Sequence, residues 1–175
     1  MPAAPQPTPD NNFDRDVAPL PAHPRSAARQ LAMQLLYQLD AQKGRNLDRI
    51  DAFLLENAPL DTKTRSLATT WTRDAWKHIN TIDEHIRRAA INWDFHRIAA
   101  VDRAIIRLAA YHLLYTPDIP PRVTINEAIE LAKRFSTAQG PSFVNGVLDS
   151  LLTALNPTAK PDTPSSPAPP KPTDS

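Results

Sequence analysis

The chain has 175 residues, with 19 prolines, only 3 glycines, no cysteine and a formal net charge of +1. The lack of cysteine excludes disulfide scaffolds, thiolate nucleophiles, Cys-ligated zinc and iron–sulfur clusters, and makes the cytoplasm the default location. The apolar runs are far shorter than the roughly 20 residues of a membrane-spanning helix, and the first residues lack the basic and apolar regions of a signal peptide.

The prolines divide the chain into three parts. Seven lie at or before Pro24 and seven at or after Pro157, in segments that have almost no aliphatic residues. Such segments cannot bury enough apolar surface to offset the entropy of ordering, so residues 1–24 and 157–175 are predicted to be disordered tails. Residues 25–156 form the predicted folded domain. It holds 17 Lys and Arg and 14 Asp and Glu, a mildly basic net charge of +3.

Apolar residues recur at three- and four-residue spacing through this domain and predict an all-helical fold of about seven helices, with no strand. The first predicted helix has Ser26 as its N-cap and ends at Gly44. A shorter helix runs from about Leu47 to Glu56 and is closed by Pro59.

From Thr62 onward the sequence places one apolar stripe on a helical face. Asn80 and Thr81 offer a cap inside this stripe, so the segment is predicted to split there into two helices.

Three further helices complete the predicted domain. Val101–Tyr115 is one, because the prolines that follow it prevent continuation. Thr124 and Glu127 have the spacing of a capping box, in which each side chain reaches the other residue's backbone N–H, and predict a helix over about 124–135. Pro141 opens the last helix, Pro141–Leu155.

No catalytic or metal-binding pattern stands out. His78, His85 and Glu84 could together ligate a metal, but the predicted helix break separates the two histidines. His96 beside Asp94 is interpreted as a local surface contact. The sequence has no Gly-x-Ser-x-Gly elbow, and three glycines cannot build a phosphate-binding loop. We therefore expect no enzyme activity, no cofactor and no metal.

Basic and aromatic residues give a stronger indication of function than these patterns do. Arg25 and Arg29 lie four residues apart at the start of the first helix, and Tyr37 follows two turns later. Guanidinium groups contact phosphates and an aromatic ring stacks a base, which is the usual combination for unpaired RNA. The alternative is that Tyr37 belongs to the core and both arginines are solvated. The pair Lys133–Arg134 and Phe143 form a second such mixture.

Two asparagines and one glycine stand out inside the apolar helical segments. Asn126 and Asn145 are expected to hydrogen-bond between helices, because a buried amide without partners costs about 1–3 kcal/mol. Gly146 costs about 1 kcal/mol relative to Ala in mid-helix and is expected to mark a close approach of a helix or ligand.

Several segments resemble the NusB transcription antitermination family. VTINEAIELAKRF over Val123–Phe135 and SFVNGVLD over Ser142–Asp149 look like the family's C-terminal signature, with matching spacing. VDRAIIRLAAY over Val101–Tyr111 resembles its middle segment, and Ala28–Tyr37 resembles its first helix. Upstream of the middle segment, the matching positions are Asp83–Ile86, Trp93 and Arg97. The resemblance covers the whole predicted domain.

The resemblance implies a NusB-like fold of about seven helices in two packed sub-bundles. It also implies binding of the single-stranded boxA element of ribosomal RNA leader transcripts, together with NusE, the small-subunit ribosomal protein that doubles as a Nus factor. The complex with other Nus factors would modify the RNA polymerase elongation complex so that it ignores Rho-dependent terminators, with no reaction catalysed and no membrane involved. The family's RNA surface would fall on Arg25, Arg29, Tyr37, Gln139 and Phe143.

The sequence departs from the family pattern at two places. The family's first helix often opens with a dense arginine cluster, whereas here only Arg25 and Arg29 remain, separated by Ser26, Ala27 and Ala28. His112 stands where the family usually has a glutamate after the tyrosine of the middle motif. RNA affinity and the NusE interface are the properties these changes would alter.

Two other functions compete with this interpretation. The same helical domain occurs in front of ribosomal RNA cytosine methyltransferases, which would require a following cofactor-binding domain. The domain could also be a protein-interaction module that no longer binds RNA. Binding of boxA-type RNA against scrambled RNA would separate these possibilities.

Overall fold

The computed structural model describes residues 19–57 and 61–157. Within them the chain forms seven α-helices and two short 3₁₀ helices, with no strand, so the all-helical prediction is confirmed. None of the helices in the described ranges is long and apolar enough to cross a membrane. The elements are α1 Pro24–Ala41, η2 Leu47–Arg49, α2 Ile50–Asn57, α3 Thr62–Lys77, α4 Ile79–Ala89, η3 Phe95–Arg97, α5 Ala100–Tyr115, α6 Pro121–Phe135 and α7 Gly140–Leu155.

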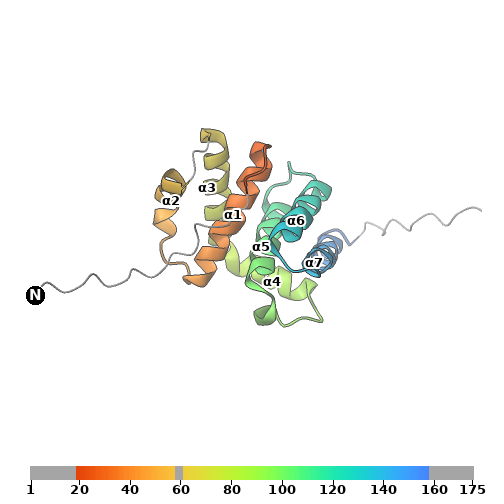
Figure 1. Ribbon diagram of the computed structural model, residues 1–175. Helices are drawn as coiled ribbons and strands as arrows, with labels where there is room; N and C mark the ends of the chain where they lie inside the picture. Colours follow the sequence, from red (N-terminus) through yellow and green to blue (C-terminus); the bar gives the residue numbers. More distant parts are fainter. Residues whose placement is uncertain (1–18, 58–60, 158–175) are drawn as a thin grey trace, which may run out of the picture.

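The helices form two groups, α1–α3 and α4–α7, which meet where α1 packs on α5. Figure 1 shows α2 and α3 on one side of α1, with α5, α6 and α7 on the other and α4 crossing near α5. α1 packs on both α3 and α5, while α5 packs on α4, α6 and α7. The two groups enclose one continuous apolar core, whose fully buried large side chains include Leu36, Ile82, Ile105, Ile106 and Leu148.

A buried charge network joins α1, α4 and α5. Arg107 of α5 donates two hydrogen bonds to Asp83 of α4, at 2.7 and 2.8 Å, and its Nη1 lies 2.9 Å from Oδ1 of Asp40 on α1. Arg103 adds bonds of 3.0 and 2.6 Å to the same Asp40. Burial favours neutral Asp40, but hydrogen bonds from both arginines outweigh it and hold the pKa of this carboxyl below its ordinary value. The network therefore fixes α1 against the second group of helices.

The starts of α1 and α6 differ from the predictions. α1 begins at Pro24, and Ser26 is not its N-cap, because the Ser26 hydroxyl donates to Glu127 Oε1 at 2.9 Å. α6 begins at Pro121, so Thr124 lies inside the helix and makes no capping box with Glu127. In both helices a proline occupies the first turn, where its fixed φ and missing N–H suit a helix start. Of the side chains expected to cap these helices, Ser26 and Glu127 hydrogen-bond to each other between α1 and α6, whereas the buried Thr124 hydroxyl has no partner.

The other predicted boundaries hold closely. The segment from Thr62 splits at His78, two residues before the expected Asn80, and Asp61 caps α3 by accepting from the Thr64 N–H at 2.8 Å. The short second helix is present as η2 and α2, although Pro59 lies outside the described residues. The helices predicted over 101–115 and 141–155 each begin one residue earlier.

Two glycines are required by their surroundings and one is not. α1 ends at Ala41, earlier than the predicted stop at Gly44. Gly44 has a φ of 77°, lies against the Trp76 ring and follows Lys43 in the left-handed turn after the helix. A Cβ on Gly140 would lie 2.0 Å from Ser136 Oγ, so this turn before α7 accepts no larger residue without rearrangement. A Cβ on Gly146 would meet nothing within 4 Å, so the expected close approach of another helix is wrong, while the alternative, the approach of a ligand, stays a prediction.

Ordered contacts begin before the predicted start of the domain. The Pro19 carbonyl accepts a hydrogen bond from Arg134 Nη2, and Leu20 packs on the core. The structured domain therefore includes residues on the N-terminal side of Arg25. Residues 1–18 and 158–175 lie outside the described part, so the disordered tails stay a prediction there.

Candidate nucleic-acid interface

The two arginines at the start of α1 have different environments. Arg25 is exposed, whereas Arg29 is 4% exposed, with Nη1 3.8 Å from Glu127 Oε2 and its guanidinium carbon 5.4 Å from the centre of the Trp71 ring. Burial lowers the pKa of Arg29, while the nearby Glu127 carboxylate opposes that shift. The pair does not present two guanidinium groups to solvent. Arg25 is available for a phosphate, and Arg29 links α1 to α6 and α3.

His112 lies in the same buried region. Its Nδ1 is 3.2 Å from Thr116 Oγ1, and the Thr116 hydroxyl already donates to the His112 carbonyl at 2.8 Å. Nδ1 is therefore the protonated nitrogen, and the buried Nε2 has no partner. Burial, with a smaller contribution from Arg29, lowers the pKa of His112 to about 3. A neutral imidazole thus occupies the position where the family usually has a carboxylate.

Tyr37 lies farther along α1, at the level of the turn between α6 and α7. Ser26 contacts Glu127, and Gln30 accepts from Arg134 at 2.7 Å, so α1 and α6 run side by side in the same direction. Tyr37 is seven residues beyond Gln30, about 10 Å along α1, and so reaches past the end of α6. Its side chain is half-buried and packs on the core. It combines a structural role with a partly accessible ring.

Gln139 and Phe143 flank the start of α7. Gln139 is exposed, and Phe143 is half-buried with its ring centre 4.9 Å from that of Trp93, at an interplanar angle of 67°. Both line one hollow between the end of α4, the segment after it, and α7. Gln139 and Phe143 therefore lie together at the start of α7. Tyr37 lies about 18 Å along α1 from Arg25, beyond the level at which α6 ends.

Trp93 was absent from the predicted site, although it matched the family pattern. It is 61% exposed, an unusual position for the largest apolar side chain. The sequence signal that could have found it is a tryptophan in a segment without helical periodicity, next to the polar residues Asn92 and Asp94.

The second predicted combination of basic and aromatic residues, Lys133–Arg134 with Phe143, does not form a common surface. Lys133 pairs with Glu130 on its own helix at 2.8 Å, and Arg134 holds Gln30 and the Pro19 carbonyl. These cations stabilise local structure around α6 and do not gather at Phe143.

The remaining polar expectations have mixed outcomes. Asn126 is exposed, so it does not bridge helices as expected. The Asp94 carboxylate accepts from the His96 N–H at 3.0 Å, which confirms a local contact. His78 stacks on Tyr115 with ring centres 4.4 Å apart. Across residues 19–57 and 61–157 no group of His, Cys, Asp and Glu could hold a metal ion.

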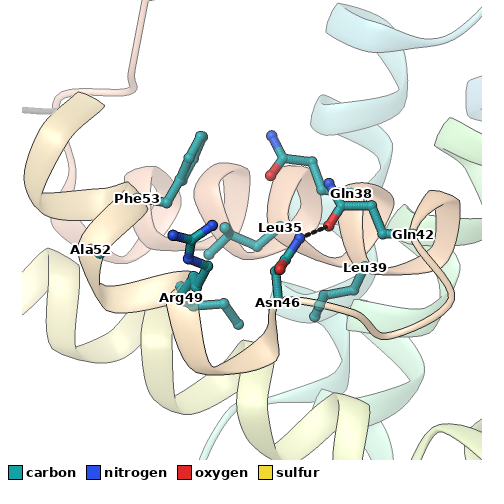
Figure 2. Close-up of a pocket in the computed structure, with 9 residues that line it drawn as sticks. Leu35, Gln38, Leu39, Gln42, Asn46, Arg49, Ala52 and Phe53 are labelled. Atoms are coloured by element: carbon teal, nitrogen blue, oxygen red, sulfur yellow. Dashed lines mark hydrogen bonds between the residues drawn. The ribbon is translucent and has the colours of Figure 1, made fainter.

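A second hollow lies between α1 and the η2–α2 segment. Figure 2 shows Gln38, Gln42, Asn46 and Arg49 around it, with Asn46 donating to Gln42 Oε1 at 2.9 Å. None of the predicted RNA-binding residues lines it. The candidate interface is therefore the surface around the α6–α7 turn.

Known proteins resemble this chain over its whole helical domain. The NusB family model matches residues 26–153. The transcription antitermination protein NusB of Methylacidiphilum infernorum is 41% identical over 73% of this chain and 90% of its own length. A solved structure of NusB from T. maritima is 35% identical, with a TM-score of 0.67, over 75% of this chain and 92% of that one.

A further solved structure is titled as antitermination factors NusB and NusE in complex with dsRNA. It is 23% identical, with a TM-score of 0.68, over 77% of this chain and 99% of that one, which shows a shared fold. The family model and the 41% identical relative go further, because they match the sequence across the helical domain. This chain belongs to the NusB family.

Proposed function

We propose that this protein is a transcription antitermination factor that binds single-stranded boxA RNA of ribosomal RNA leaders together with NusE. In complex with RNA polymerase and other Nus factors it would prevent premature Rho-dependent termination, acting in the cytoplasm without catalysing a reaction. The observation that carries this proposal is the family match across residues 26–153, combined with exposed or half-exposed aromatic and amide side chains around the α6–α7 turn. Curated relatives bear the name of antitermination proteins, and one related structure is titled as NusB and NusE in complex with dsRNA.

The side chains around the turn have the chemistry that unpaired RNA requires. Tyr37 and Phe143 each keep part of an aromatic ring accessible, and stacking of one base is worth about 1–3 kcal/mol. The Gln139 amide can both donate to and accept from a base edge. Arg25, exposed at the other end of α1, would contact a phosphate. Arg29 acts indirectly in this proposal, by holding α1 on α6 through Glu127.

The charge distribution explains why a partner is needed. A domain charge of +3 and one exposed arginine at the start of α1 supply few phosphate contacts, so the sequence-independent part of RNA binding is small. NusE would extend the surface. By linkage, NusE must raise RNA affinity by the same factor by which RNA raises NusE affinity. The corresponding coupling free energy is typically about 1–3 kcal/mol.

The test is a titration of labelled boxA-type RNA into the full chain, with and without saturating NusE. Scrambled RNA of the same length is the control. We expect weak binding alone, binding about five- to 150-fold tighter with NusE, and a preference for boxA over the scrambled sequence. Equal affinity for both RNAs in the presence of NusE would contradict the proposal and favour a protein-interaction module.

A further inference from the structure

The hollow beside Phe143 is the most exposed apolar feature of α4, α7 and the short segment that follows α4. Its edge carries Ile91, 85% exposed, and Trp93, 61% exposed. Trp93 meets Phe143 edge to face, and more than half of the indole still faces solvent. The contact with Phe143 orients the indole, and the 61% exposure of Trp93 leaves ring surface accessible to an occupant of the hollow.

The lining of the hollow is uncharged. Apart from apolar groups it presents two amides, Asn92 and Gln139, and two hydroxyls, Ser142 and Ser150, with no Lys, Arg, Asp or Glu. A carboxylate would repel RNA, and a purely apolar lining would suit a hydrophobic peptide. Open aromatic rings surrounded by amides and hydroxyls suit a nucleobase, whose faces stack while its edges form hydrogen bonds.

The floor of the hollow is formed by α7 at a residue without a side chain. Gly146 lies one turn after Phe143 and next to Val147, and a Cβ there would meet nothing within 4 Å. Glycine in mid-helix is unfavourable relative to alanine, and neither packing nor a positive φ requires it here. The space above Gly146 is therefore open to an occupant.

We propose that this hollow is a base pocket in which Trp93, oriented by Phe143, stacks one unpaired RNA base above Gly146. The inference rests on the proposed RNA-binding function and assigns Trp93 as an RNA-contacting residue in addition to Tyr37, Gln139 and Phe143. Asn92 and Gln139 lie where they can contact the base edge. Arg97, exposed four residues after Trp93, supplies a cation for the adjoining phosphate.

The experiment compares the affinity of NusE-saturated full-length variants for a labelled boxA-type RNA. Trp93→Ala removes the stacking ring, and Gly146→Leu extends a side chain into the pocket from a position where a Cβ has no neighbour within 4 Å. Each should weaken RNA binding about tenfold or more. Trp93→Phe keeps a ring and should stay within about threefold of the wild type. Circular dichroism and NusE affinity are measured for every variant.

A matched control separates base stacking from the loss of exposed apolar surface in general. Leu55→Ala removes an apolar side chain that is as exposed as Trp93, at 61%, but lies on α2 and does not line the hollow. This variant should bind RNA as the wild type does. RNA should also quench the tryptophan fluorescence of the wild type, and the quenching should disappear in Trp93→Phe, where the buried Trp71 and half-buried Trp76 remain.

The outcomes distinguish failure of the pocket from failure of the proposed function. If Tyr37→Ala weakens RNA binding but folded Trp93→Ala and Gly146→Leu do not, the pocket is overturned and the function stands. If Trp93→Ala and Gly146→Leu lose NusE affinity while their RNA affinity is unchanged, the hollow binds protein and the proposal is wrong. Wild-type protein that does not distinguish boxA from scrambled RNA refutes both.

Discussion

Lowering the pH from neutral toward 5 should destabilise the domain through one buried imidazole, that of His112. The side chain is 2% exposed, its Nε2 has no partner, and its pKa is about 3 in the folded state. In the unfolded chain the pKa returns to about 6.5. Between these values the unfolded state binds more protons than the folded state. The contribution of neutral His112 to the stability is therefore fully present above pH 6.5 and is lost as the pH falls toward 3.

The size of the effect follows from the width of this window. One pKa unit corresponds to about 1.4 kcal/mol, so a fall from pH 6.5 to 5 should cost about 2 kcal/mol of unfolding free energy. Asp40 also has a shifted pKa, which is lowered from 3.8. The stability that ionised Asp40 contributes is therefore present above pH 3.8 and is lost only below it. The loss between pH 6.5 and 5 should thus come from His112.

Urea denaturation at several pH values tests the reasoning. In His112→Gln the new side chain cannot be protonated in this range. This variant should therefore lose little unfolding free energy between pH 6.5 and 5, whatever its stability at neutral pH. His96→Gln, at an exposed histidine, should keep the loss of the wild type. An NMR titration of His112 in the wild type provides a measurement that needs no variant. Identical losses in His112→Gln and the wild type, or a His112 that titrates near 6.5, would refute the account.

Three further predictions test other parts of the structure. Arg107→Ala should cost about 3–5 kcal/mol in urea denaturation because it leaves buried Asp83 without its bidentate partner; a loss below 1 kcal/mol would contradict the network. Gly140→Ala should lower the melting temperature, and adding Ser136→Gly should restore it, because the new methyl group would overlap the serine side chain; no restoration would mean that the clash is not the cause. Arg25→Ala should reduce the log–log salt dependence of RNA binding by about 0.7, whereas Arg29→Ala should reduce stability and leave that slope unchanged; equal slopes for both variants would place both guanidinium groups on phosphates.

Local sequence rules predicted the helices well because periodicity and prolines act within a few residues. They placed the boundaries of α5 and α7 within one residue and the end of α1 within three, at Gly44 instead of Ala41. They failed for Ser26 and Glu127, which fit local capping patterns but hydrogen-bond to each other across 101 residues. Such a contact depends on how α1 packs on α6, and no local pattern contains that information.

The candidate site was predictable by residue type and less so by exposure. Spacing places Arg25 and Arg29 near each other, but it does not reveal that α6 and α3 cover only the second. Gly146 was expected to be tightly packed because glycine inside a helix usually has a steric reason, whereas the structure leaves open space above it. The contact between Trp93 and Phe143 joins residues 50 positions apart and requires the fold.

Transcription through a Rho-dependent terminator tests the central claim most directly. A template carrying boxA upstream of the terminator is transcribed with RNA polymerase, Rho, NusE and the other Nus factors, with and without this protein. We predict that the wild-type protein increases readthrough on the boxA template but not on one with a scrambled boxA, and that a folded Tyr37→Ala variant increases it less. Equal readthrough with and without the wild-type protein on the boxA template would contradict the assignment as an antitermination factor.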